Sequence, residues 1–125
     1  MRVQVTLVSR NLDTGEEKVI ADSPALLNEN RLRYEEKEEH AIHDVLFEEN
    51  HVVLKRKADV TSTTELFLED SGTSLVESPW GIMNLSSETE TITRDKDRWI
   101  VEYSIYSGNE RVLHQRLEWK IRYFS

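Results

Sequence analysis

The first residues that could do chemistry together are two histidines in an acidic segment. His40 and His43 lie three positions apart, close to Glu36 and further carboxylates. Imidazole and carboxylate groups together suit zinc or nickel. Two histidines with this spacing share a face only on a helix, however, and the segment reads better as a strand followed by a charged loop. We therefore expect no metal and no cofactor, and we place both histidines in an exposed loop.

A second candidate is an arginine on an otherwise apolar strand face. In an extended chain, Arg56 shares a face with Val52 and Leu54, so its guanidinium group could point inward. A buried guanidinium needs a carboxylate, an amide oxygen or a bound anion, because an unpaired buried charge is strongly unfavourable. Glu36, on the same predicted face as Tyr34, is one partner. The alternative is that Arg56 lies at a rim and reaches water.

Hydroxyl groups line other predicted strands. Ser62 and Thr64 alternate with apolar residues, and one face of residues 83–91 runs from an apolar to a hydroxyl-bearing end. An interior with one apolar and one polar end would orient an amphipathic ligand. In the alternative, these hydroxyls face outward or line a water-filled cavity. The aromatic side chains expected to fill the core are Trp99, Trp119, Tyr103 and Tyr123.

The elements that must position these residues are strands. Apolar and polar residues alternate with a period of two over residues 99–105 and again over residues 113–123, around a turn at residues 107–109. The same alternation, separated by turn-forming residues, continues through the rest of the chain. The predicted strands are Arg2–Arg10, Glu16–Asp22, Arg31–Glu38, Ile42–Glu48, His51–Lys57, Asp59–Glu69, Thr73–Glu77, Ile82–Thr93, Arg98–Ser107 and Glu110–Tyr123.

A helix competes with strands in one segment, residues 30–49. It contains good helix formers, but no apolar residue lies between Glu35 and His40, so a helix would have no continuous stripe to dock. Short helical turns are expected near residues 23–27, where they would cover one mouth of the fold.

An antiparallel sheet of this many strands must close on itself or form a sandwich, because an open edge recruits other chains. Consecutive hairpins favour closure without long crossovers. A barrel of about eight strands is just filled by its own side chains, so about ten strands leave an interior space. We predict an all-β fold: a single closed antiparallel up-and-down barrel of about ten strands over residues 1–125, with an internal cavity.

Composition narrows the function classes. The net charge of -8 opposes binding to the phosphates of nucleic acids or to anionic membranes. The chain has no cysteine, which excludes disulfides and thiol chemistry. Its first residues alternate in polarity, whereas a signal peptide needs a continuous apolar core of roughly 7–15 residues. A cytoplasmic protein is expected, without a membrane or nucleic-acid partner.

Three features, taken in order, resemble a known family. They are residues 52–57 ending in basic side chains, the Ser78-Pro79-Trp80-Gly81 block within residues 77–85, and the two strands around Tyr103 and residues 117–121. The chain resembles the YwiB-like bacterial proteins, a domain-of-unknown-function family with a calycin-like (lipocalin-like) β-barrel. The resemblance implies a barrel with a lumen in a cytoplasmic bacterial protein and brings no established activity.

These observations favour a non-enzymatic barrel that binds a small amphipathic or anionic ligand. The residues expected at its lumen or mouth are Arg56, Tyr34, Glu36, Trp80 and Tyr103. One alternative is an interaction domain whose acidic surface binds a basic protein partner. An enzyme would need an acid–base pair in the lumen, for which the candidate residues are Glu36, His43, Glu102 and Tyr103.

Overall fold

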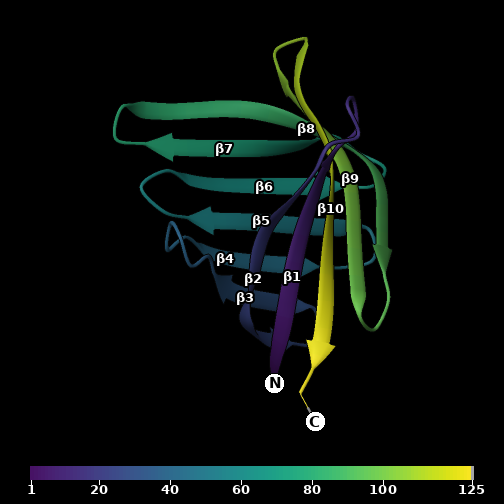
Figure 1. Ribbon diagram of the computed structural model, residues 1–125. Helices are drawn as coiled ribbons and strands as arrows, with labels where there is room; N and C mark the ends of the chain where they lie inside the picture. Colours follow the sequence, from purple (N-terminus) through teal and green to yellow (C-terminus); the bar gives the residue numbers. More distant parts are fainter. Residues whose placement is uncertain (125) are drawn as a thin grey trace.

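In the computed structural model, which describes residues 1–124, every regular element is a β-strand (Figure 1). The strands are β1 (Arg2–Asn11), β2 (Glu17–Asn28), β3 (Arg31–Glu35), β4 (Ile42–Phe47), β5 (His51–Lys57), β6 (Thr61–Phe67), β7 (Gly72–Ser78), β8 (Gly81–Arg94), β9 (Arg98–Ser107) and β10 (Glu110–Tyr123).

The strands form a closed antiparallel barrel in which each strand pairs with its neighbours in the sequence. The barrel closes at β1, where Val3 lies opposite Ala25 of β2 on one side and opposite Tyr123 of β10 on the other. This topology confirms the predicted up-and-down barrel of about ten strands. Because every connection is a hairpin, residues that share an inward face on neighbouring strands come together around one interior.

The period-two pattern places most of the core as predicted, although Tyr123, which we expected in the core, is 39% exposed near the end of β10. Val3 and Val5 of β1, Val101 of β9 and Ile121 of β10 are all buried on the inner face. Three large aromatic side chains pack together in the interior: the Phe47 ring lies 5.2 Å from Trp99 and 6.0 Å from Trp119, centroid to centroid. These aromatic side chains fill the end of the barrel where β9 begins, so open space remains toward the opposite end of the barrel.

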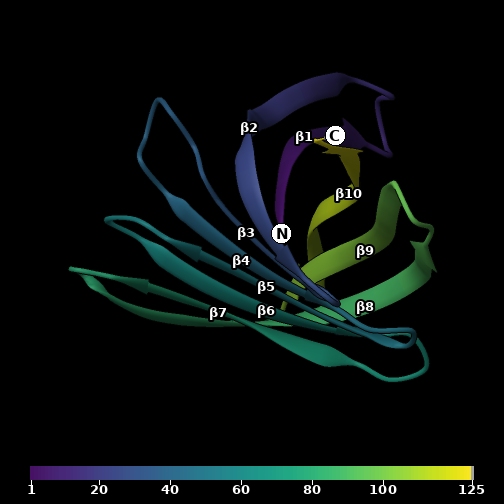
Figure 2. The same cartoon turned by 90° about the horizontal axis from the view of Figure 1, so that it is seen from below.

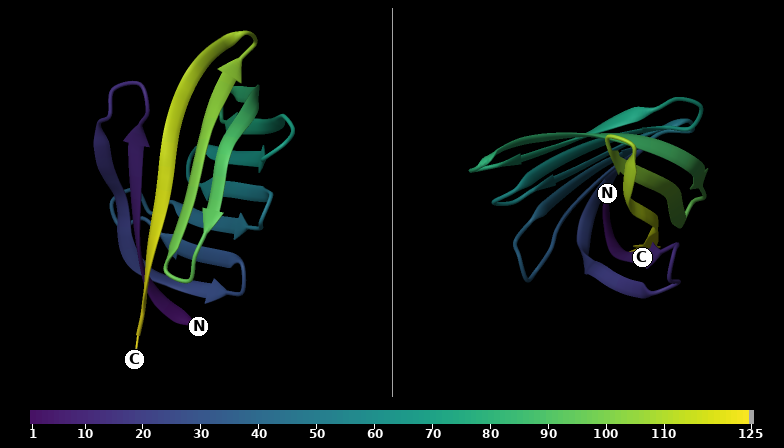
Figure 3. Two further views of the ribbon diagram at one scale, coloured as in Figure 1. Left: turned by 90° about the vertical axis from the view of Figure 1, so that its right-hand side faces the viewer. Right: turned by 90° about the horizontal axis from the view of Figure 1, so that it is seen from above.

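The barrel is not a regular cylinder. The hairpin ends of β5–β8 splay outward from β1, β2 and β10, as Figures 2 and 3 show. Strand β8 pairs with β7 from its first residue, Gly81, whereas its pairing with β9 begins at Ser86. The first part of β8 therefore pairs on one side only.

Two segments differ from the sequence-based expectation. Residues 23–27 form no helical turn but continue β2, because Ala25 lies opposite Val3 of β1 and Tyr34 of β3, and paired strands on both sides hold it extended. Strand β3 ends at Glu35 rather than at Glu38, and a short loop follows in which His40 adopts a left-handed φ of 54°. This loop carries Glu36 and Glu39 to the barrel opening.

Candidate functional site

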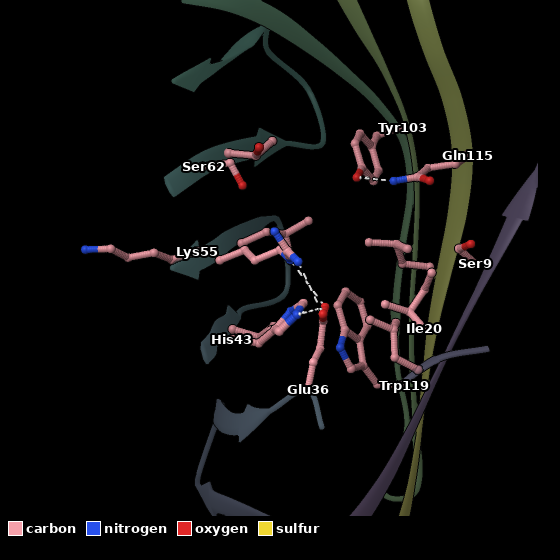
Figure 4. A pocket seen from close by; sticks show the side chains of 15 residues that line it. Ser9, Ile20, Glu36, His43, Lys55, Ser62, Tyr103, Gln115 and Trp119 are labelled. Carbon is pink, nitrogen blue, oxygen red and sulfur yellow. Dashed lines mark hydrogen bonds and ion pairs between the residues drawn. The ribbon is translucent and has the colours of Figure 1, made fainter. Parts of the chain in front are cut away.

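A cavity of about 260 Å³ lies inside the barrel (Figure 4). It adjoins the end of β1 and the middle of β10, because Leu7 and Ser9 line it on β1 while Gln115 and Leu117 line it on β10. Its apolar wall consists of Leu7, Ile20, Val45, Leu54, Leu117 and Trp119. The polar wall is formed mainly by Glu36, His43, Arg56, Ser62, Tyr103 and Gln115. The structure thus places an apolar and a polar wall around one space.

Glu36 is the centre of a hydrogen-bonded cluster at one side of the cavity. Its Oε1 accepts a hydrogen bond from His43 Nε2 at 2.5 Å and one from Arg56 Nε at 3.3 Å, and its Oε2 accepts one from Arg56 Nη2 at 3.2 Å. Arg56 Nη2 also donates to Glu39 Oε2 at 2.5 Å. The guanidinium group of Arg56 is therefore paired within the protein, and its side chain is one-third exposed. It points inward and still reaches the rim.

The orientation of His43 follows from its second neighbour. Trp119 Nε1 donates to the Tyr34 hydroxyl oxygen at 2.9 Å, and that hydroxyl lies 3.3 Å from His43 Nδ1. An indole nitrogen can only donate, so the Tyr34 proton is free to be donated to Nδ1. The imidazole then carries its proton on Nε2 and donates it to Glu36. The Tyr34 and His43 rings stack 4.7 Å apart, which fixes the imidazole plane.

Together, burial and pairing lower the pKa values of both Glu36 and His43 in this cluster. Burial raises the pKa of Glu36, but the hydrogen bonds from Arg56 and His43 outweigh it and lower that pKa below its ordinary value. Burial is also the largest influence on His43, and it lowers the pKa of this imidazole more than the Glu36 carboxylate raises it. At neutral pH the cluster therefore consists of a carboxylate, a neutral imidazole and a guanidinium ion.

The opposite side of the cavity carries unused hydrogen-bonding capacity. Gln115 Nε2 donates to the Tyr103 hydroxyl oxygen at 2.6 Å, so the Tyr103 proton remains available. Burial raises the pKa of Tyr103 to about 12, which keeps this hydroxyl protonated. Within residues 1–124, neither the Ser62 hydroxyl nor Arg56 Nη1 makes a hydrogen bond. The Lys55 ammonium group points away from the other labelled side chains (Figure 4). The polar groups left for a ligand are mainly donors.

The structure brings together three of the five residues predicted for the lumen. Arg56, Glu36 and Tyr103 line the cavity. Tyr34 is buried behind it and contacts the site through His43 and Trp119. Trp80 does not line the cavity: it lies in the turn between β7 and β8 and is 91% exposed. The prediction for Trp80 is corrected because the splayed hairpin carries this side chain into solvent.

Sequence reasoning also misplaced His43, which we expected in an exposed loop. It lies on β4, is buried and shares the inner face with Val45 and Phe47. The alternation of these three residues was visible in the sequence and could have identified the inward direction. Among residues 1–124, no three histidine or carboxylate groups are arranged to hold a metal ion.

These features define a single all-β protein built as a closed ten-stranded barrel around a partly polar cavity. The sequence matches a domain of unknown function, DUF1934, over residues 5–118, and the chain belongs to that family. No curated protein matches the chain. A similar solved structure is the crystal structure of the ywiB protein from Bacillus subtilis, with a TM-score of 0.73 and 16% identity, covering 99% of this chain and 92% of that one. At this identity the likeness concerns the fold.

In the part of the chain that the structure describes, no helix could cross a membrane.

Proposed function

We propose that this protein is a non-enzymatic, calycin-like barrel that binds a small amphipathic ligand in its cavity, in the cytoplasm of a bacterium. The observation that supports this proposal is the division of the cavity into an apolar wall and a wall with free hydrogen-bond donors. An apolar body would pack against Leu54, Leu117 and Trp119, and a polar head would accept from Tyr103 and Arg56.

The charge balance limits the head group. Arg56 already faces two carboxylates, Glu36 and Glu39, so the site has no unpaired positive charge that demands an anion. The free donors favour a head with acceptor oxygens, such as a carbonyl, a hydroxyl or a carboxylate. The volume of about 260 Å³ is slightly below the roughly 300–1,000 Å³ of common small-molecule sites, which favours a compact ligand.

The same contacts argue against acid–base catalysis by the Glu36–His43 pair. Both imidazole nitrogens are engaged, one by Glu36 and the other by Tyr34. Both Glu36 oxygens are also engaged. A general base must have a lone pair directed at the proton that it removes, and the one free lone pair of the neutral His43 imidazole, on Nδ1, already accepts from the Tyr34 hydroxyl. The cluster instead stiffens the opening of the site.

Native mass spectrometry of gently purified protein, compared with the same sample after denaturation, tests for a resident ligand. A small mass that leaves on unfolding would identify the ligand class. Binding of hexanol, hexanoate and hexylamine is then measured by calorimetry, because the three share one apolar body and differ in the head. We expect hexanol and hexanoate to bind more tightly than hexylamine, and Tyr103→Phe to weaken hexanoate binding about tenfold by removing one hydrogen bond.

A matched pair of variants separates binding in the cavity from binding elsewhere. Ser62→Phe places a ring in the cavity, whereas Thr63→Phe places the same ring on the opposite face of β6. Binding should be lost in the first variant and kept in the second. Equal binding in both variants, or no ligand and no binding of any probe, would contradict the proposal.

The acidic surface supports a second candidate, binding to a basic protein. The carboxylates at positions 35, 38, 48 and 49 are exposed, and the net charge is -8. Complex formation by this route would weaken steeply with salt, because exposed charges are screened. A complex that survives high salt would argue against this candidate.

A further inference from the structure

The first part of β8 is an open edge of the barrel sheet. Residues Gly81–Leu85 pair with β7, and pairing with β9 begins only at Ser86. In Figure 1 this half of β8 is the outermost strand above β7, with no strand beyond it. Within residues 1–124, the backbone groups on that side therefore have no strand partner. A row of unpaired N–H and C=O groups is a template for another strand.

Apolar side chains lie on both faces of this edge. Ile82 is 68% exposed and Met83 is 55% exposed, although successive residues of a strand point to opposite faces. Neither face of the splayed hairpin is covered at this point. Trp80, in the adjoining turn, is 91% exposed. Apolar residues concentrated along an open edge are typical of an interaction surface rather than of isolated exposure.

The edge also lacks the features that usually block strand pairing. Natural edge strands are protected by lysines, prolines, bulges or other charges. Residues 78–87 are the longest stretch of this sequence without a charged side chain, in a chain with 32% charged residues. Gly81–Leu85 contains no proline, and its pairing with β7 is without a register shift. Neither the backbone nor any charged side chain of Gly81–Leu85 therefore blocks pairing with another strand.

We infer that a second copy of this chain pairs with the edge, through an antiparallel β8–β8 contact centred on Met83. In that register Met83 lies opposite Met83 of the other copy, and Ile82 lies opposite Asn84. The nearest carboxylate, Glu88, falls opposite Ser78, so no like charges oppose each other. When a segment pairs with itself around a twofold axis, the unpaired backbone groups of both copies gain partners at once. Twofold symmetry is the commonest symmetry of soluble oligomers.

Charge indicates where two copies of the chain can meet. Each molecule carries a net charge of -8, so two copies repel each other over most of their surfaces. Close approach is least costly where a long uncharged stretch meets its own image, which is the case along β8. The pairing involves five residues per copy, and an interface well below about 1,200 Å² is typical of weak, reversible association.

The test is sedimentation equilibrium of the full chain from about 10 μM to about 1 mM, the range expected for a weak dimer. We expect the average mass to rise from 14.7 kDa toward twice that value as concentration increases. Met83→Lys and Ile82→Lys should each keep the chain monomeric. In Met83→Lys the two lysines would lie directly opposite each other, and in Ile82→Lys they would be diagonal neighbours on one face of the paired strands, so both variants place like charges close together. The matched control is Leu26→Lys: Leu26 is 57% exposed but lies on a strand already paired on both sides.

The outcomes are distinct. A dimer that is lost in both β8 variants and kept in Leu26→Lys supports the inference. A wild-type chain that stays monomeric up to about 1 mM overturns it, and leaves the edge open to an extended segment of another protein. Dimerisation that persists in Met83→Lys also overturns it. Circular dichroism of each variant checks that the fold is intact, which is expected because both β8 side chains are exposed.

Discussion

Removing the guanidinium group of Arg56 tests how the polar wall of the cavity is held. In Arg56→Met, the apolar stem remains and the charge is lost. Glu36 then keeps its hydrogen bond from His43 but loses both bonds from Arg56, while it remains only 9% exposed. A buried carboxylate that loses its cation is costly. We expect the folded state to be destabilised, in contrast to the view of Arg56 as a group reserved for a ligand.

The magnitude follows from the distance and the exposure. At 3.2 Å, the Arg56–Glu36 attraction is about 5 kcal/mol for an effective dielectric constant of 20 and about 1.3 kcal/mol in water. Arg56 is one-third exposed, so the attraction lies between these limits and is partly offset by desolvation. We expect Arg56→Met to lower the free energy of unfolding by about 2 kcal/mol.

The assay is urea unfolding followed by tryptophan fluorescence, with a double-mutant cycle. Glu36→Gln and the double variant Glu36→Gln/Arg56→Met complete the cycle, and a coupling energy of about 1–2 kcal/mol is expected. The surface control is Arg31→Met, because the Arg31–Asp44 pair is more exposed and should contribute less than about 0.5 kcal/mol.

The coupling should also depend on pH. The pKa of Glu36 is lowered in the folded state, so the stabilisation is present above its ordinary value of 4.5 and is lost as the pH falls through the folded value. A coupling energy below about 0.3 kcal/mol at pH 7, or an effect of Arg56→Met no larger than that of Arg31→Met, would refute the reasoning.

Three further predictions concern other buried positions. Because burial lowers the pKa of His43 below its ordinary 6.5, the unfolded chain takes up a proton first as the pH falls; the free energy of unfolding should decrease below pH 6.5, and His43→Gln should reduce this slope in urea titrations at successive pH values. A Cβ at Gly72 would lie 2.0 Å from the Glu65 carbonyl oxygen, so Gly72→Ala should destabilise the chain by about 2–3 kcal/mol in urea unfolding; the exposed neighbour Thr73→Ala should have little effect, and equal effects would contradict the packing argument. Ser87 Oγ donates to the same carbonyl at 2.7 Å, so Ser87→Ala should cost about 1–2 kcal/mol by calorimetry, and an unchanged melting temperature would show that this hydrogen bond is dispensable.

The alternation of apolar and polar residues and the order of the hairpins were sufficient to predict most of the fold. Alternation over β9 and β10 was sufficient to place Trp99, Val101 and Trp119 inside, because a strand has only two faces and burial selects one. Consecutive hairpins then limited the topology to a closed meander. The pairing of Arg56 with Glu36 was also within reach, since both residues fell on predicted inner faces and an inward charge requires a partner.

The contacts between residues on different strands depend on the tertiary structure and could not be predicted from the alternation of faces along each strand. Trp119 and Tyr34 are 85 positions apart, yet their hydrogen bond fixes the tautomer of His43. Trp80 was expected at the lumen or its mouth, but it lies in the turn between β7 and β8, and the splay of that hairpin exposes it. Alternation sets the direction of each side chain, whereas strand register, barrel tilt and curvature set which side chains meet across the interior. Those quantities depend on all ten strands together, so the sequence determined the barrel and its inward residues, and only the closed sheet determined the cavity.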